Sequence, residues 1–270
     1  MENGVWGVAR SWIITFASSW ERVTGKWPID NSAIMNNNVC CIVGAVTGKW
    51  RVEGCAVMDN NVCFIVGAGD YYGLDFLPDP GDYVIGADGG LTYLERSGLT
   101  ANLVIGDFDS LKQRPEHPHV ITLNKEKDDT DTFAAVREGI SLGYRVFHLY
   151  CCTGGRLDHT IANIQLLAYL AENSMKGFLF DKDSITTAVT DGSIRFNPCS
   201  GGYISVFSYS EKSSGVCVKG LKYTLDDADL SNIFPLGVSN EFIGGESVLS
   251  VRKGTIIVVF PREAKISTPR

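Results

Sequence analysis

Two aspartates with one residue between them, Asp107 and Asp109, are the first candidates for chemistry in this chain. They follow a short apolar run at 103–105, and in an extended segment both carboxylates would point to the same side, with Phe108 on the other. Two carboxylates at a strand end can hold Mg²⁺, which takes its remaining ligands from water and phosphate oxygens. A solvated acidic turn is the simpler alternative for this motif alone.

A second acidic group opens a predicted helix, where Lys127-Asp128-Asp129-Thr130-Asp131 precedes apolar residues at helical spacing. Asp and Thr commonly cap helix starts, because their oxygens accept hydrogen bonds from free N–H groups there. One cap requires one such residue, and three aspartates repel one another unless a cation joins them. The excess favours a metal or nucleotide role.

Glycine-rich turns provide the third group. Gly154-Gly155 precedes Arg156 and Asp158 at another predicted strand-to-helix junction, and Asp88-Gly89-Gly90 repeats the pattern earlier in the chain. Glycines let a backbone approach a ligand closely, a helix start favours an anion, and Arg can bind phosphate through two parallel hydrogen bonds. A plain turn with a surface Arg–Asp pair is the alternative.

The elements that must position these residues alternate regularly from residue 62 to residue 180. We expect strands at 62–66, 82–87, 103–105, 119–123, 145–151 and 177–180, and helices at 91–97, 131–142 and 157–170. This alternation predicts an α/β domain, a mostly parallel sheet with helices on both faces. Ligands of such sheets bind at the carboxyl ends of the strands, where the polar groups above fall.

The pattern changes after about residue 181 to short strands without a long helix. Asp191-Gly192 predicts a hairpin turn between strands at 185–190 and 193–196, and Lys253-Gly254 predicts another between strands at 247–251 and 255–260. We therefore expect an all-β sandwich domain at 183–270, following an α/β domain at 58–182.

Residues 1–57 are expected to be an extension outside the catalytic fold. The segment at 35–45 nearly recurs at 58–68, but two copies do not make a repeat architecture. A local duplication, or read-through from an earlier start codon, explains the pattern, with Met58 as the natural start.

Composition excludes several classes of protein. The chain has 31 acidic and 24 basic residues, a net charge of −7, which argues against a nucleic-acid partner. No apolar run reaches the roughly 18 residues of a membrane span. The eight cysteines show no CxxC spacing, which indicates reduced thiols and a cytoplasmic protein.

Taken together, these motifs resemble those of the thiamine pyrophosphokinase family, in the family's order over about residues 60–262. The matching segments are 87–90, 106–110, 127–131, 154–159, 220–223 and 239–241. The resemblance implies transfer of a pyrophosphate group from ATP to the hydroxyethyl group of thiamine, giving thiamine diphosphate and AMP. It also implies Mg²⁺, a homodimer, and a thiamine site near the subunit interface.

The resemblance implies roles for individual residues as well. The catalytic residues would be Asp107, Asp109, Asp131, Lys127 and Arg156, with the three aspartates binding metal. ATP would contact Asp88, Gly89, Gly90, Asp128, Thr130, Gly154 and Gly155. Thiamine would contact Asp158, Tyr223, Ser239 and Asn240. Members of the family in animals and fungi often have Trp at the ring-stacking position, where this chain has Tyr223.

Two other functions remain open on the residues alone. A metal-dependent sugar-nucleotide transferase would explain Asp107 and Asp109, but not the acidic helix start or the Gly154–His159 segment. A non-catalytic nucleotide sensor would not require so many carboxylates of the metal-binding type.

Overall fold

The computed structural model of the chain describes residues 42–46, 49–53, 58–108, 116–124 and 129–267. The chain divides into two compact units, Met1–Cys55 and Ala56–Arg270. In the first unit, strands β1 (Ile42–Val46) and β2 (Lys49–Glu53) form an antiparallel pair.

The first part of the second unit alternates strands and helices, as the sequence predicts. The elements are β3 (Met58–Val66), β4 (Tyr83–Ala87), α2 (Gly90–Arg96), β5 (Leu103–Gly106), β6 (Val120–Thr122), α3 (Asp131–Ser141), β7 (Tyr144–Tyr150), α4 (Leu157–Glu172) and β8 (Lys176–Phe180). Among the described residues, no helix is both long and apolar enough to cross a bilayer.

The later part of the unit consists of short strands. They are β9 (Ser184–Thr190), β10 (Ser193–Phe196), β11 (Tyr203–Ser208), β12 (Lys212–Lys219), β13 (Leu225–Ser231), β14 (Gly237–Glu241), β15 (Ser247–Ser250) and β16 (Thr255–Pro261). The expected α/β fold followed by a β-sandwich arrangement is confirmed.

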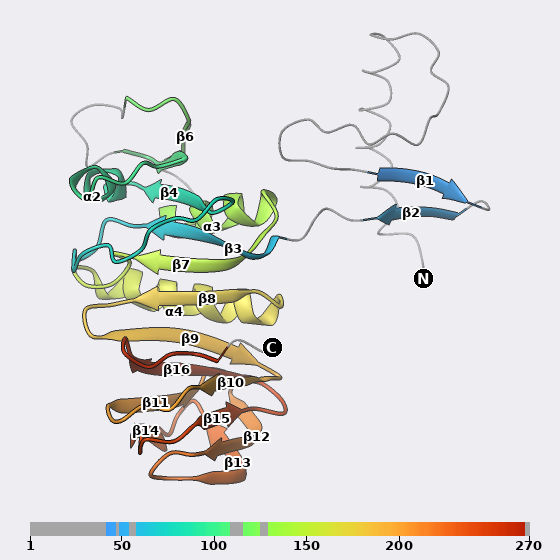
Figure 1. Cartoon of the computed structure of the whole chain (residues 1–270), viewed down its shortest axis with the longest axis vertical. Coiled ribbons are helices and arrows are strands. Elements are labelled where there is room, and N and C mark those ends of the chain that lie inside the picture. Colours follow the sequence, from blue (N-terminus) through green and yellow to red (C-terminus); the bar gives the residue numbers. More distant parts are fainter. Residues whose placement is uncertain (1–41, 47–48, 54–57, 109–115, 125–128, 268–270) are drawn as a thin grey trace. The chain divides into compact units, whose positions relative to one another are not determined.

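One large sheet runs through both parts of the unit (Figure 1). Within the described residues its order is β14-β11-β16-β9-β8-β7-β3-β4-β5-β6. The strands from β8 to β6 are mutually parallel, whereas β9, β16, β11 and β14 join them in antiparallel pairs. The carboxyl ends of six neighbouring strands therefore lie at the same edge.

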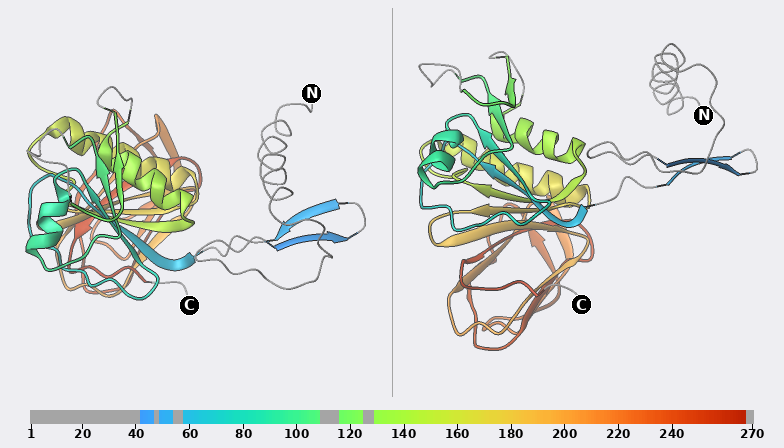
Figure 2. Two further views of the ribbon diagram at one scale, coloured as in Figure 1. Left: turned by 90° about the horizontal axis from the view of Figure 1, so that it is seen from above. Right: turned by 45° about the horizontal axis from the view of Figure 1, so that its top comes forward.

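Apolar side chains cover both faces of the parallel part, because successive residues of a strand point to opposite faces. Helices α3 and α4 lie on one face (Figure 2), where Ala135 and Leu167 pack with Ile65 and Ile85. Helix α2 covers the other face, where its Leu94 belongs to the same buried cluster as Phe64, Val84 and Val104. Burial on both faces explains why these strands read as continuous apolar runs.

A second sheet, of order β10-β15-β12-β13, shares an apolar core with the antiparallel part of the large sheet. Both predicted hairpins are wrong. Strand β9 lies in the large sheet and β10 in the small one, and β15 and β16 are divided in the same way. The turns at Asp191-Gly192 and Lys253-Gly254 therefore carry the chain from one layer to the other, as at the corner of a sandwich.

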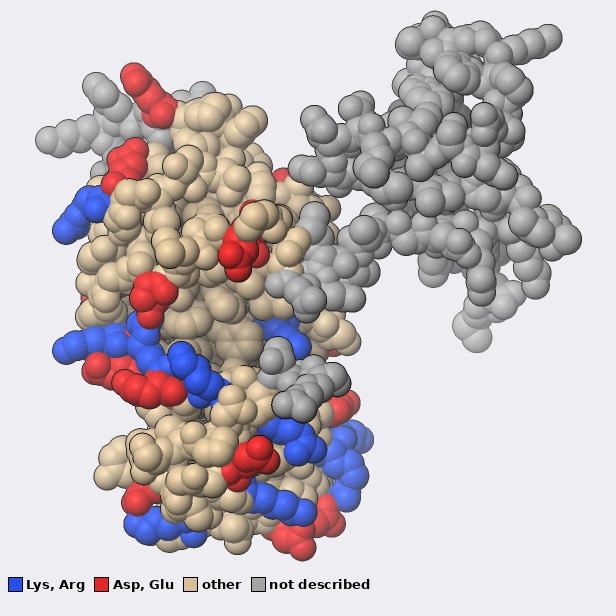
Figure 3. Space-filling view, viewed as in Figure 1, with Lys and Arg blue, Asp and Glu red and all other residues tan. Residues whose placement is uncertain are grey.

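The surface of the unit carries mixed charge. On the face drawn in Figure 3, Lys and Arg lie among Asp and Glu over the described residues instead of forming one continuous basic stripe.

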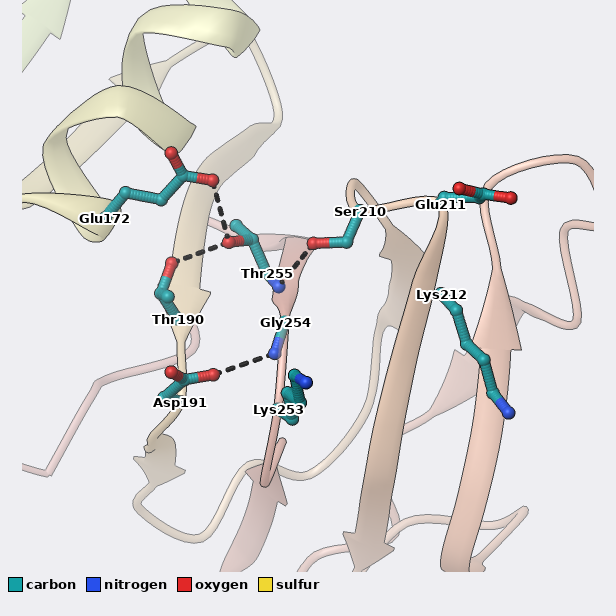
Figure 4. A pocket seen from close by; sticks show the side chains of 9 residues that line it. All are labelled: Glu172, Thr190, Asp191, Ser210, Glu211, Lys212, Lys253, Gly254 and Thr255. Atoms are coloured by element: carbon teal, nitrogen blue, oxygen red, sulfur yellow. Dashed lines mark hydrogen bonds between the residues drawn. The ribbon is translucent and has the colours of Figure 1, made fainter.

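A polar network joins the end of α4 to the β-rich part (Figure 4). The Thr255 hydroxyl lies 2.8 Å from the Thr190 hydroxyl and 3.3 Å from Glu172 Oε1. The Thr255 backbone N–H donates to the Ser210 hydroxyl at 3.0 Å, and Gly254 N–H donates to Asp191 Oδ1 at 2.7 Å. The residues of the network line a hollow at the sheet edge opposite the carboxyl ends of the parallel strands.

Replacing Thr255 with Val should lower the free energy of unfolding by about 1–3 kcal/mol, because Val keeps the shape but removes the partner of Thr190 and Glu172. Thr255 is 1% exposed, so water cannot replace the hydroxyl. Urea unfolding measures the effect, with exposed Thr224→Val as the matched control. Equal midpoints for the two variants would contradict a stabilising role for this network.

A chain beginning at Met58 should fold and turn over substrate like the full chain, with a melting temperature within a few degrees of it. The basis is the division of compact units at Cys55 and the placement of every predicted site residue after it. Thermal melting and size-exclusion chromatography check this. Aggregation or early melting of the shortened chain would show that residues 1–57 complete the fold.

Candidate active site

The predicted nucleotide residues that the structure describes lie at the common carboxyl edge of the parallel strands. Asp88 follows β4, Asp107 follows β5, and Gly154 follows β7 by a short turn. Asp131 opens α3, the helix after β6. Asp109, Lys127 and Asp128 lie outside the described residues.

Backbone hydrogen bonds tie the turns of this edge together. Gly69 N–H donates to the Cys151 carbonyl at 2.7 Å, and Asp70 N–H donates to the Thr153 carbonyl at 2.8 Å. Asp88 N–H similarly donates to the Ile105 carbonyl at 2.8 Å. The turns after β3, β4 and β7 are therefore held by neighbouring strands, which favours a preformed binding edge.

Three non-glycine residues at this edge have left-handed backbone conformations. Asp88, Phe108 and Cys151 have φ values of 51°, 56° and 53°. Such residues are uncommon and concentrate at functional sites, where the surrounding structure holds them. Because the backbone of Phe108 is not extended, the prediction that the Asp107 and Asp109 side chains point to one side and Phe108 to the other is wrong. The Phe108 ring is instead buried, at 7% exposure, and anchors the turn in the core.

The glycines after Asp88 serve packing. A Cβ on Gly90 would overlap the Val66 carbonyl oxygen, so only glycine lets the first turn of α2 lie against the end of β3. A Cβ on Gly89 would approach the Ala68 methyl to 3.3 Å. Close packing thus explains Gly90 without any ligand.

Thr130 is the N-cap of α3, and its hydroxyl accepts a hydrogen bond from Phe133 N–H at 3.1 Å. Asp129, just before α3, pairs with Arg137, about two helical turns further along the chain. One member of the acidic group therefore has a local partner, and the cap is provided by Thr130 instead of an aspartate.

Gly154 and Gly155 have φ values of 76° and 58°, which L residues rarely adopt. The Asp70 carboxylate lies against Gly154 in the space that a Cβ would occupy. It also accepts a hydrogen bond from the Tyr72 hydroxyl at 3.0 Å. Beside it, the Thr153 hydroxyl donates to Asp181 Oδ1 at 2.8 Å. Sequence reasoning missed Asp70 and Asp181, although each follows a strand of the sheet.

Arg156 and Asp158 pair with each other. Arg156 Nε and Nη2 donate to the two carboxylate oxygens of Asp158 at 3.2 and 2.5 Å, and this bond lowers the pKa of Asp158. Both side chains are exposed, so the pair adds little stability and can be exchanged for ligand contacts at small cost.

Asn240, one of the predicted thiamine residues of the β-rich part, holds another of them, Tyr223, in place. Asn240 Oδ1 accepts from Tyr223 N–H at 3.0 Å, and Asn240 Nδ2 donates to the Tyr223 carbonyl at 2.6 Å. Asn240 therefore fixes the backbone of Tyr223, whose ring is 59% exposed. The Lys222 ammonium lies 5.4 Å from the ring centre and pairs with Glu241. Ser239, next along β14, has a left-handed backbone with φ of 57°.

Among the described residues, no group of three His, Cys, Asp or Glu side chains converges as a metal site. The donor types at this edge nevertheless suit Mg²⁺, because Asp107 and Asp131 offer carboxylate oxygens.

Comparisons with known proteins cover both parts of the unit. Residues 77–179 match the sequence model of the thiamin pyrophosphokinase catalytic domain, and residues 193–256 match that of the family's vitamin B1 binding domain. The two matches follow one another in this order along the chain, as the site residues do. This chain belongs to the thiamin pyrophosphokinase family.

Individual members of the family support the assignment. The chain is 29% identical over 182 residues to the thiamine pyrophosphokinase of Bacillus subtilis, covering 65% of this chain and 85% of that protein. The crystal structure from the same organism aligns with a TM-score of 0.68 at 26% identity, over 76% of this chain and all of the other. The structure from Geobacillus thermodenitrificans aligns with a TM-score of 0.65 at 27% identity, over 75% and 98% of the two chains.

Proposed function

We propose that this protein transfers the pyrophosphate group of ATP to the hydroxyl group of thiamine, giving thiamine diphosphate and AMP. The observation that carries the proposal is the succession of a family catalytic domain and a family vitamin B1 binding domain in one chain. The strand-end turns of the catalytic domain suit the phosphates of ATP. The exposed aromatic ring of the vitamin B1 binding domain suits the thiazolium ring of thiamine.

In the proposal, ATP lies along the carboxyl edge of the parallel strands. Asp88, Gly89 and Gly90 border the nucleotide on one side, and Thr130, Gly154 and Gly155 on the other. Arg156 exchanges Asp158 for a phosphate oxygen, and Lys127 and Asp128 join this set. The exposed Arg156–Asp158 pair supports such an exchange, because little stability is lost when it opens.

Asp107, Asp109 and Asp131 would hold Mg²⁺, which supplies charge neutralisation on the triphosphate when bound. The thiamine hydroxyl attacks the β-phosphorus, the bond to the α-phosphate oxygen breaks, and AMP leaves. Arg156 and Lys127 orient the triphosphate and offset the negative charge on the leaving AMP. This direct transfer needs no covalent enzyme intermediate.

Thiamine would stack on Tyr223, with Asp158, Ser239 and Asn240 at its periphery. The exposure of Tyr223 supports this role, since an accessible aromatic face can receive the thiazolium cation. Asn240 would act mainly by fixing Tyr223, because both of its amide atoms bond the Tyr223 backbone.

The proposal includes a homodimer. Its support is a strip of exposed apolar side chains on and around β14, comprising Ile233, Phe234, Leu236, Val238 and Ile243. Contiguous exposed apolar side chains of this kind mark protein interfaces. A cytoplasmic location is also proposed, consistent with the free thiols of the described cysteines.

Incubation with ATP, Mg²⁺ and thiamine tests the proposal. AMP should form only when thiamine is present. A sugar-nucleotide transferase would release a nucleoside diphosphate from a sugar nucleotide instead, and a nucleotide sensor would release nothing.

Replacing Tyr223 with Ala should raise the thiamine KM about 2- to 30-fold, the effect of losing a cation–aromatic contact of roughly 0.5–2 kcal/mol. The ATP KM should stay nearly unchanged, and melting should change little because the ring is exposed. Tyr223→Trp should be tolerated or improve binding. A large loss of stability with an unchanged thiamine KM would assign Tyr223 a packing role and place the stacking residue elsewhere.

A further inference from the structure

An aromatic hollow lies on the sheet face that α2 partly covers, and none of its lining residues is among those assigned to ATP or thiamine. In the register of strands β3, β7 and β8, His148 lies opposite Phe64 on one side and Phe178 on the other. Two residues further along β7 and β8, Tyr150 lies opposite Phe180. All five side chains therefore stand on one face in two short rows.

Four of these rings form a closed contact cycle together with Phe76 from the loop after β3, and the fifth, Phe178, contacts His148. Phe76 stacks on Phe64 with centres 4.1 Å apart, and Tyr150 stacks on Phe180 with centres 4.4 Å apart. Phe76 also contacts Tyr150, at 4.9 Å between ring centres, and His148 contacts both Phe64 and Phe180, at 5.4 and 5.0 Å. The hollow above them has a volume of about 460 Å³, within the range of small-molecule sites.

His148 is the unusual member of this set. Its ring contacts Phe64, Phe178 and Phe180, and within the described part of the chain its imidazole makes no hydrogen bond. Burial lowers the pKa of His148 to about 4, so the ring is neutral at pH 7 and offers one donor and one acceptor nitrogen. The ring is only partly buried and belongs to the lining of the hollow, so a bound ligand can meet its nitrogens.

Charged residues border the opening of the hollow. Arg262 lies 5.5 Å from the Phe180 ring centre and pairs with Asp75 at 2.6 Å, with only 19% of its side chain exposed. Lys265 adds a second cation from the C-terminal segment. Two cations against one carboxylate favour a ligand with a negative group at this end.

We infer that this hollow binds a flat heteroaromatic acid of one or two rings. The ring would lie among Phe64, Phe178 and Phe180, with a ring heteroatom hydrogen-bonded to His148 and the acid group directed toward Arg262 and Lys265. The inference does not depend on the proposed pyrophosphate transfer, because it uses none of the residues assigned to ATP or thiamine.

The test titrates the full chain with three probes by calorimetry. Indole-3-acetate has the flat ring, the ring N–H and the acid. Indole-3-acetamide lacks the charge, and 1-naphthaleneacetate lacks the ring N–H. We expect saturable binding of indole-3-acetate with a Kd below about 1 mM, and about tenfold weaker binding of each of the other two. Saturating AMP and thiamine should leave the Kd unchanged.

Two substitutions at one position provide the matched comparison. His148→Phe keeps a ring but removes both nitrogens, so it should weaken indole-3-acetate binding about tenfold, whereas His148→Gln keeps a polar edge and should bind within about threefold of the unsubstituted chain. Without probe, His148→Phe should melt at nearly the same temperature, since the imidazole makes no hydrogen bond within the described residues that the substitution would break. Phe234→Ser, on the apolar strip, should leave the Kd for indole-3-acetate unchanged.

Several results would overturn the inference. One is the absence of saturable indole-3-acetate binding up to about 1 mM. Another is equal affinity of His148→Phe and His148→Gln for this probe. Loss of binding in Phe234→Ser, or displacement of the probe by AMP and thiamine, would also contradict the inference. A clear drop in the melting temperature of probe-free His148→Phe, with His148→Gln unaffected, would also contradict it, because the imidazole would then have a partner within the protein.

Discussion

Asp107→Asn should lower kcat by roughly 100- to 1,000-fold, while the protein still folds. The substitution preserves size but removes one negative charge from the proposed magnesium site. Charge stabilisation of this kind contributes several kcal/mol to the transition state, and each 1.36 kcal/mol corresponds to about a factor of ten in rate. Asp109→Asn should behave similarly, because the proposal gives both carboxylates the same role.

The stability of this variant should change little, since Asp107 is only partly buried at the end of β5 and its neighbour Phe108 provides the core anchor. Steady-state kinetics and thermal melting measure the two effects separately. Asp226→Asn, the same change on an exposed part of β13, is the control and should leave turnover unchanged. Near-normal turnover by folded Asp107→Asn would remove this residue from the catalytic set.

Gly90→Ala should lower the free energy of unfolding by more than about 3 kcal/mol, because the new Cβ would overlap the Val66 carbonyl and force the start of α2 away from β3. For a unit of this size, the melting temperature should fall by about 6 °C or more. The displaced helix start would also move the neighbouring Asp88 turn, so the ATP KM should rise.

Gly245→Ala is the matched control, because nothing lies within 4 Å of a Cβ at that position. Gly89→Ala, whose Cβ would approach Ala68 at 3.3 Å, should fall between the two. This variant keeps the comparison informative if Gly90→Ala yields no soluble protein. Equal melting temperatures for Gly90→Ala and Gly245→Ala would contradict the packing explanation.

The α/β part could be predicted closely because its local signals agree with its tertiary structure. Parallel strands buried on both faces give continuous apolar runs, and glycines or capping residues such as Thr130 mark the helix boundaries. Because ligands of parallel sheets bind at the carboxyl ends of the strands, the sequence also predicts that Asp88, Asp107 and Gly154 lie at one edge.

The β-rich part was less predictable because strand partners depend on long-range packing. Asp191-Gly192 has the composition of a hairpin turn but joins two different sheets, a choice made by the shared core of the sandwich. Strand β13, with the sequence Leu225-Asp226-Asp227-Ala228-Asp229, has too few apolar residues to show alternation, and it was missed together with β14. The role of Asn240 in fixing Tyr223 likewise depends on a contact across 17 residues.

The fate of the γ-phosphate of ATP distinguishes transfer of a pyrophosphate group to thiamine from transfer of a single phosphate. The full chain is incubated with ATP labelled at the γ-phosphate, Mg²⁺ and thiamine, and the products are separated by chromatography. We expect one AMP for each thiamine diphosphate, with the label retained in the thiamine product, and formation of both products at least about 100-fold slower with Asp107→Asn. Formation of ADP with a singly phosphorylated thiamine, or no thiamine-dependent AMP at all, would contradict the proposed transfer.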